Sequence, residues 1–210
     1  MHYLTDYSKS LYYLTNGEKT KFDVSFLVSE PTNSFCIDLN RKLSKYGNNE
    51  IVMGSESIIF PHISLFMGYI DSFEMLCEVS KVVESYAKET SPFTLDFDKL
   101  YFASVRPSSP KYVFVDSKQN DYLMEQKYTF HNQLQKLVIP IGWNMKDERA
   151  HITIACFKDI PNEVYKEASL PHDIPSCKIS QIGISLTGSR GVCLGLLKAY
   201  TLTGKTTILN

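Results

Sequence analysis

Alternating and helical patterns of apolar residues follow one another along the first third of the chain. Lys21–Val28 alternates apolar and polar side chains as far as Leu27, a period of two that predicts a strand. Apolar residues then recur at helical spacing from Phe35 to Tyr46. A further strand is expected around His62, so this part of the chain predicts a strand–helix–strand unit.

A second unit of the same order begins near residue 111. Lys111–Asp116 is a short β-rich run, and a long helical pattern extends from Leu123 to Leu137. Pro140 stops that helix because proline lacks the backbone N–H that a helix interior needs. A strand around His151 completes the unit.

The two units place their histidine strands at matching positions. Forty positions separate Phe22 from His62, and 39 separate Tyr112 from His151. The period of 89 residues between the histidines is longer than solenoid repeats. The matching order and spacing therefore predict a duplicated domain with two lobes, the first carrying His62 and the second carrying His151.

The remaining patterns extend this domain to the C-terminus. We expect residues 21–210 to form a single two-lobed domain and residues 1–20 to form an N-terminal arm of uncertain structure. Further elements are a helix from Phe73 to Tyr86, an irregular strand from Phe93 to Ala103, a short helix opened by Pro161, and a terminal hairpin turned at Gly188–Gly191.

Composition narrows the class of protein without naming it. The 210 residues carry a net charge of -1, so no strong global field attracts nucleic acid or an anionic membrane, and any anion site must be built locally. The five cysteines have no C-x-x-C spacing, which favours reduced thiols in a cytoplasmic protein and suggests no zinc site. No apolar run is long enough to span a membrane, and we expect no export by a signal peptide.

Each histidine strand carries one imidazole and one hydroxyl on the same face. Side chains alternate along a strand, so His62 shares a face with Ser64, and His151 shares a face with Thr153. The apolar residues between them point the other way. On a single strand, a histidine and a hydroxyl in this arrangement are commonly a half-buried polar pair with no catalytic role. Two such strands that face one cleft would supply two proton-transfer groups and two hydroxyl donors.

Histidine suits proton transfer near neutral pH, because its unperturbed pKa is about 6.5. One ring could take a proton from an attacking water or hydroxyl while the other gives a proton to a departing ribose oxygen. Ser64 and Thr153 would donate hydrogen bonds to the non-bridging phosphate oxygens. Which of His62 and His151 is the base depends on how the substrate lies, and the sequence leaves this open.

The chain resembles the 2H (two-histidine) phosphoesterase superfamily in this pair of His-x-Ser/Thr strands. The resemblance is carried by Pro61–Leu65, by His151–Ile154, and by the spacing between them. It implies an α+β fold of two duplicated β-α-β lobes, with antiparallel sheets flanking a central cleft. It also implies action on 2′,3′-cyclic phosphates, 2′-5′ linkages or related phosphates of RNA and nucleotides, without a metal or other cofactor.

Four further residues are weaker candidates for contact with substrate. Phe66 has the strand parity of His62 and could stack on a base, although core packing is the alternative. Arg149 has the parity of His151 and could approach a phosphate, unless it is simply exposed. Trp143 could cover the cleft or pack in the interior, and the role of Tyr69 is left open between the same two possibilities.

Four alternatives remain open at this point. The chain could bind a nucleotide or RNA without turnover, or could form a purely structural domain. A metal site on the two histidines is a poor alternative, since no acidic residue or cysteine lies at ligand spacing around them. Ligation through a 2′-5′ bond would use the same site. We expect a nucleotide or RNA-end phosphodiester as substrate, no membrane, and no protein partner that the sequence reveals.

Overall fold

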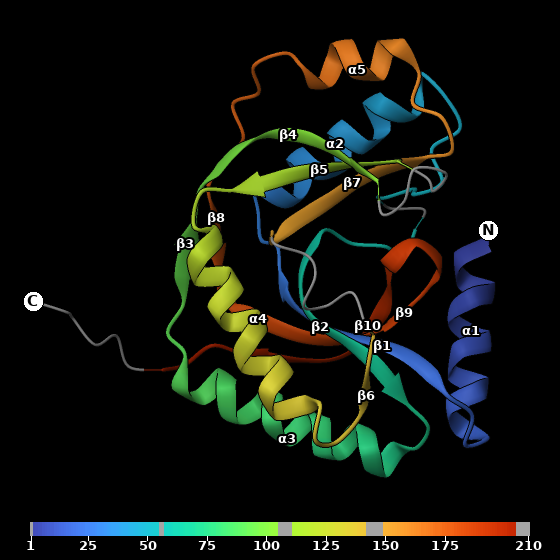
Figure 1. Cartoon of the computed structure of the whole chain (residues 1–210), viewed down its shortest axis with the longest axis vertical. Coiled ribbons are helices and arrows are strands. Elements are labelled where there is room, and N and C mark those ends of the chain that lie inside the picture. Colours follow the sequence, from blue (N-terminus) through green and yellow to red (C-terminus); the bar gives the residue numbers. More distant parts are fainter. Residues whose placement is uncertain (1, 55–56, 105–110, 142–148, 205–210) are drawn as a thin grey trace, which may run out of the picture.

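The computed structural model describes residues 2–54, 57–104, 111–141 and 149–204, which form a curved antiparallel sheet flanked by helices (Figure 1). The strands of the large sheet follow the order β10-β9-β1-β2-β7-β5-β4, and β6 also pairs with β2. Its strands are β1 (Thr20–Leu27), β2 (His62–Ile70), β4 (Phe97–Ser104), β5 (Lys111–Ser117), β6 (Ile139–Pro140), β7 (His151–Phe157), β9 (Gln181–Thr187) and β10 (Cys193–Thr201).

Two halves of the large sheet meet between β2 and β7. The first half is β10-β9-β1-β2 and the second is β7-β5-β4, and the ladder that joins them consists of the pair Ile63 and Ile152. The α+β class and the antiparallel pairing are therefore confirmed. The two sheets run into one another at this pair, so the lobes share one sheet instead of each holding a separate one.

The helices cross between the halves. Helix α2 (Thr32–Ser44) follows β1 of the first half but packs on β7 of the second, and α4 (Asn120–Leu134) follows β5 but packs on β2. Helix α3 (Phe73–Glu89) lies against β9 and β10, and the short α5 (Asn162–Ala168) lies near α2 (Figure 1). Each half thus buries its sheet with a helix supplied by the other, and one hydrophobic core runs through both.

Asn40 of α2 fixes one of these crossings with buried hydrogen bonds. Its amide nitrogen donates to the carbonyl oxygens of Ile154 (2.7 Å) and Ile51 (2.9 Å), and its amide oxygen accepts from the Met53 N–H (3.0 Å). The side chain is 1% exposed. A fully hydrogen-bonded buried amide of this kind ties the first half to the His151 strand.

Both histidine strands contain a bulge at the same place. Ser25 pairs with Ser64 while Val24 pairs with Phe66, which leaves Leu65 as the extra residue. In the second half Phe114 pairs with Thr153 while Val113 pairs with Ala155, which leaves Ile154 as the extra residue. A bulge shifts the alternation of side chains by one, so residues beyond it face the opposite side from that expected.

The structure places residues 2–20 and refines one predicted element. The N-terminal helix α1 (His2–Thr15) packs on β1, β9 and β10. The predicted strand from Phe93 to Ala103 is interrupted at Asp96, and its first part, β3 (Phe93–Leu95), pairs with β8 (Cys177–Ile179) in a separate small sheet. No helix within the described ranges is long and apolar enough to cross a bilayer.

Candidate active site

The Ile63–Ile152 pair brings the two histidine motifs side by side. Because the strands are antiparallel, His62 and Thr153 flank this pair on one side, and Ser64 and His151 flank it on the other. Both isoleucines are buried in the core, so the four polar side chains share the opposite face of the sheet. Each of the four residues is therefore the chain neighbour of one directly opposed pair.

This face opens onto a cavity of about 650 Å³. Ser64, His151 and Thr153 line it. His62 is 6% exposed and is not among the lining residues, so it is the most enclosed member of the group. The cavity therefore presents one imidazole and two hydroxyls directly, with the second imidazole at a deeper level.

The backbone just before β2 orients the His62 ring. Nδ1 of His62 lies 2.9 Å from the carbonyl oxygen of Phe60, and only a protonated Nδ1 can form this hydrogen bond, because a carbonyl cannot donate. The Phe60 ring also meets the imidazole edge to face at 5.7 Å between centroids. These contacts leave Nε2 as the nitrogen that can exchange a proton with a ligand.

A buried carboxylate on the neighbouring strand contacts the first motif. Asp23 of β1 is 0% exposed, and the Ser64 hydroxyl donates a hydrogen bond to its Oδ2 at 2.7 Å. The other oxygen, Oδ1, is buried and has no hydrogen-bond partner among the described residues. Burial raises the pKa of the Asp23 carboxyl, and the charge of His62 and the Ser64 hydrogen bond oppose that rise.

The second motif has aromatic neighbours at the equivalent positions. Phe114 of β5 stands opposite Thr153 of β7, just as Ser25 of β1 stands opposite Ser64 of β2. Two residues earlier on their strands, Tyr112 of β5 therefore occupies the position that Asp23 has on β1. The rings of Phe114 and His151 are stacked, with centroids 3.7 Å apart and planes 25° from parallel. The two halves of the site are thus related by fold but differ in chemistry: hydroxyls and a carboxylate surround one histidine, and aromatic rings surround the other.

Arg149 lies where its strand parity places it, on the cavity wall near His151. It forms an ion pair with Asp116, the residue opposite His151 on β5, and its guanidinium lies 5.2 Å from the centre of the Tyr101 ring. These contacts hold the guanidinium at the cavity, where it can approach an anion.

Three more cations line the cavity, and the sequence did not single them out. They are Lys21 of β1, Lys127 of α4 and Arg190 of the turn between β9 and β10. Lys127 is only 4% exposed, and Arg190 pairs with Glu50. Because they come from separate elements, the sequence contains no local cluster of basic residues that would reveal them, yet together they place positive side chains around the cavity.

Phe66 is not a cavity residue, and its assignment to the face of His62 was wrong. The bulge at Leu65 turns Phe66 toward the core, where it is 1% exposed and packs against Phe22 with ring centroids 5.9 Å apart. Met67 takes the cavity-facing position instead. Core packing was the alternative for Phe66, and the structure supports it.

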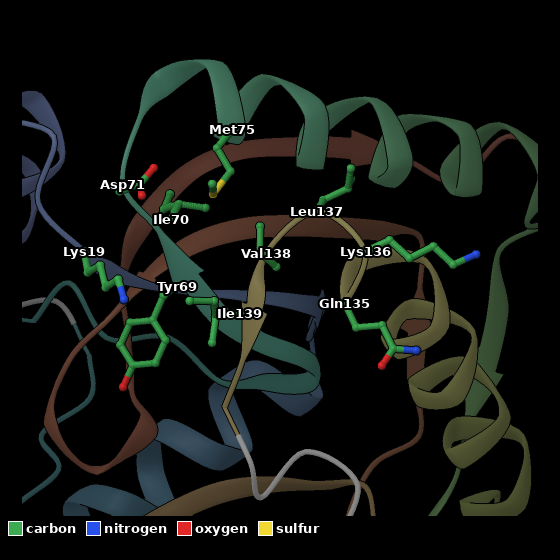
Figure 2. Close-up of a pocket in the computed structure, with 10 residues that line it drawn as sticks. All are labelled: Lys19, Tyr69, Ile70, Asp71, Met75, Gln135, Lys136, Leu137, Val138 and Ile139. Atoms are coloured by element: carbon green, nitrogen blue, oxygen red, sulfur yellow. The ribbon is translucent and has the colours of Figure 1, made fainter.

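Tyr69 lines a different and smaller pocket of about 190 Å³ (Figure 2). Its companions there include Lys19, Asp71 and Ile139, and none of the four motif residues belongs to it. The structure therefore does not place Tyr69 among the residues that line the central cavity. Trp143 falls outside the described residues.

One group of described residues could offer ligands to a metal ion. A ring nitrogen of His62, a carboxylate oxygen of Asp23 and Sγ of Cys193 lie within 4.8 Å of one another. Zinc accepts such a mixed set, but it binds cysteine as the thiolate. Burial, followed by the nearby Asp23 charge, raises the pKa of the Cys193 thiol well above its usual value, and this opposes the thiolate form. We assign no reaction step to a metal.

Solved structures with this arrangement of strands and helices are known. TT0787 of Thermus thermophilus superposes with a TM-score of 0.64 at 14% identity, over 88% of this chain and 99% of that one. The chain has the fold of the two-histidine phosphoesterases. E. coli LigT in its apo form gives a TM-score of 0.56 at 17% identity, over 89% of this chain and 99% of LigT.

A further phosphoesterase structure shares this two-histidine phosphoesterase fold at a TM-score of 0.53 and 15% identity, over 89% of this chain and 99% of that one. LigT has also been solved in complexes with 3′-AMP, with phosphate and with NADP+. No family profile and no curated protein sequence matches the chain. At sequence identities of this size, the structural similarity establishes the fold alone.

Proposed function

We propose that the protein is a metal-independent phosphodiesterase that uses His62 and His151 as an acid–base pair. Its substrate would be an RNA-type or nucleotide phosphodiester: a 2′,3′-cyclic phosphate, a 2′-5′ linkage or a cyclic oligonucleotide. The observation that carries this proposal is the Ile63–Ile152 pair, because it sets two imidazole–hydroxyl strands in register on one face of the sheet. A structural domain has no need to align two such motifs.

The chemistry follows from the functional groups of the two motifs. One imidazole removes a proton from the attacking water or ribose hydroxyl, and the other protonates the departing ribose oxygen. Thr153 on the cavity wall donates a hydrogen bond to a non-bridging oxygen, where charge must be held during transfer. Ser64 can do the same only when its proton is released from Asp23, because that proton now lies in the Ser64–Asp23 hydrogen bond.

The size and walls of the cavity support a small nucleotide ligand. Its volume of about 650 Å³ falls in the range of small-molecule sites, roughly 300–1,000 Å³. Tyr101 and Tyr112 offer ring faces on which a base could stack, and Lys21 and Arg190 offer charge to phosphates. Binding of 3′-AMP and phosphate by LigT, which has the same fold, agrees with a ligand of this class.

The decisive experiment is a panel of phosphodiesters assayed with EDTA present throughout. The panel holds 2′,3′-cyclic nucleotides, 2′-5′ and 3′-5′ dinucleotides and cyclic dinucleotides, and wild type is compared with the His62→Ala/His151→Ala double variant. We expect turnover of at least one class by wild type, a bell-shaped rate–pH profile, and loss of turnover in the double variant. Activity that disappears with EDTA, or that survives in the double variant, would overturn the proposal.

One observation favours a second candidate function, nucleotide binding without turnover. His62 is 6% exposed and does not line the cavity, and a base or acid must reach the reacting oxygen within about 2.6–3.2 Å. Calorimetry that shows tight binding of a 2′,3′-cyclic nucleotide, with no product after prolonged incubation, would support this candidate.

The reverse reaction, formation of a 2′-5′ bond, would make the protein a ligase. It is tested by incubating RNA that ends in a 2′,3′-cyclic phosphate together with RNA that begins with a 5′-hydroxyl.

A further inference from the structure

Lys127 is a cation within the apolar stripe of helix α4. The buried residues of this helix recur at helical spacing and are Leu123, Lys127, Phe130 and Leu134. The three apolar ones belong to the hydrophobic core, whereas Lys127 is 4% exposed and lines the central cavity. Lysine is rarely buried to this extent, because an ammonium group loses its hydration when it leaves water. An apolar residue would suit this position better, so the retained charge points to a function.

The cavity opens where the two motif strands separate. Their ladder consists of a single pair among the described residues, and beyond it the N–H of Ala150 donates to Oδ1 of Asn120 on α4 (2.8 Å). On β2, the carbonyl of Met67 accepts from the N–H of Ile141 (3.0 Å). Ala150, Met67 and Ile141 all line the cavity. At this place the backbones of β2 and β7 therefore form hydrogen bonds with other segments, and α4 is one of them.

Two contacts show where Lys127 lies along α4, which runs from β5 toward β6 (Figure 1). Asn120 accepts its hydrogen bond from the residue before His151 on β7. His131 lies beside Phe66 of β2, with ring centroids 6.2 Å apart. Lys127 is seven residues after Asn120 and four before His131, so the three share one face of the helix. Lys127 thus lies between a contact to one motif strand and a contact to the other.

Lys127 differs from the other cations of the cavity in its burial. Lys21, Arg149 and Arg190 are exposed, and solvent and salt screen exposed charges. Among the described cations that line the cavity, Lys127 alone is buried. A charge interacts more strongly in such an environment than in water. An ammonium group also has three N–H donors, so it can serve a phosphate oxygen and a protein group at the same time.

We propose that Lys127 binds a non-bridging oxygen of the scissile phosphate from the interior side of the cavity. This inference rests on the phosphodiesterase function proposed above. Ser64 and Thr153 can donate hydrogen bonds to the phosphate, but they carry no charge. Lys127 balances the negative charge that a phosphodiester holds in the ground state and that grows on its oxygens during transfer. The helix that crosses from the other half therefore completes the site beneath the two motifs.

Pairs of ligands that differ only in a phosphate test this contact. The 2′- and 3′-monophosphates of the common ribonucleosides, and the parent nucleosides, are titrated into the full chain and followed by NMR. Lys127→Met has a side chain of similar length and no charge. We expect this variant to raise the Kd of the bound monophosphates at least about tenfold, a loss typical of a hydrogen bond to a charged group. The Kd of the nucleosides should change less than about twofold, because they carry no charge.

Two further variants serve as controls. Lys21→Met makes the same change at an exposed cation of the cavity and should raise the Kd of the monophosphates less than about threefold. Lys127→Arg keeps the charge and should bind the monophosphates more tightly than Lys127→Met.

The stability of Lys127→Met separates a phosphate contact from a structural role. The substitution continues the apolar stripe of α4, so its urea midpoint should equal or exceed that of wild type. A merely structural lysine would lower the midpoint when replaced and would weaken monophosphates and nucleosides by the same factor. If Lys127→Met does not fold, Lys127→Gln supplies the same comparison of charged and uncharged ligands.

Turnover distinguishes this inference from the function beneath it. On the phosphodiester that wild type cleaves fastest, Lys127→Met should lower kcat/KM at least about tenfold, and Lys127→Arg should recover part of the loss. Unchanged monophosphate binding in Lys127→Met, or no monophosphate binding by wild type, overturns the inference, and turnover by wild type would still support the phosphodiesterase. Selective loss of monophosphate binding, in a protein whose wild type cleaves no member of the panel, supports the phosphate contact and overturns the phosphodiesterase.

Discussion

Leu65 and Ile154 occupy equivalent positions in the two halves, and each is the extra residue of a bulge directly after a motif hydroxyl. On β2, Ser64 lines the cavity and the bulge turns Phe66 toward the core, and on β7 the bulge follows His151 and Thr153, which both line the cavity. Both bulge residues are buried, and the carbonyl of Ile154 is held by Asn40. The direction of the side chains along both motif strands therefore depends on these two bulges, which occur at equivalent positions in the two halves.

Single substitution of either histidine should reduce turnover strongly. We expect His62→Ala and His151→Ala each to lower kcat about 10²- to 10⁴-fold on the phosphodiester of the panel that wild type cleaves fastest, because each variant lacks one general acid–base group. Steady-state kinetics with circular dichroism as a check on folding measure this. His172→Ala is the matched control, since that ring lies away from the cavity beside Phe35. Loss of turnover in the control alone would contradict the assignment.

The two motif hydroxyls should contribute unequally. Thr153 lines the cavity, whereas the Ser64 proton is engaged by Asp23. Removal of a hydrogen bond to the developing charge costs roughly 3–4 kcal/mol in measured cases, so Thr153→Val should lower kcat about 10²-fold or more. Ser64→Ala should lower it about tenfold or less. Equal effects in the two variants would show that Ser64 turns from Asp23 to the phosphate when substrate binds.

The free energy of unfolding should depend on pH in a way that reflects the buried Asp23 carboxyl. Its pKa in the folded protein is raised above 3.8, mainly by burial, so the folded state binds this proton more tightly than the unfolded chain. The resulting stabilisation is complete below about pH 3.8 and is lost as pH rises through the raised pKa. Asp23→Asn, which has no charge to bury, should escape this loss.

Urea unfolding at pH 4, 6 and 8 measures the effect. We expect Asp23→Asn to match wild type near pH 4 and to have the higher free energy of unfolding at pH 8, because the variant has no buried charge there. Asp98→Asn, at an exposed position, should show no such trend. A difference in free energy of unfolding between Asp23→Asn and wild type that disappears or changes sign toward pH 8 would contradict this prediction.

Asn40 should be essential for stability although it lies outside the cavity. Asn40→Ala removes the partners of three buried backbone groups, those of Ile51, Met53 and Ile154. Each buried group left without a hydrogen bond costs about 1–3 kcal/mol, so we expect the free energy of unfolding to fall by about 3 kcal/mol or more. The exposed Asn132→Ala is the control. A loss below about 1 kcal/mol would mean that water replaces the amide.

Much of the architecture was visible along the chain, because the alternation of side chains on a strand and the 3.6-residue period of a helix are local properties of the backbone. These periods located the two histidine strands, and the equal spacings within the units indicated two related halves. The faces of His62, Ser64, His151 and Thr153 followed from strand parity alone. The same reasoning failed at Phe66, because a bulge depends on how two strands pair and leaves no mark in either strand's own pattern.

Asp23 is the clearest case of a property that arises from long-range packing. In the sequence it is one polar residue of an alternating strand, the usual sign of a solvent-exposed face. In the fold its strand lies between β2 and β9, and Ser64 and Cys193, distant in the chain, close over the carboxyl. Local sequence specifies which side chains share a face, whereas burial and charge coupling depend on which distant segments cover that face.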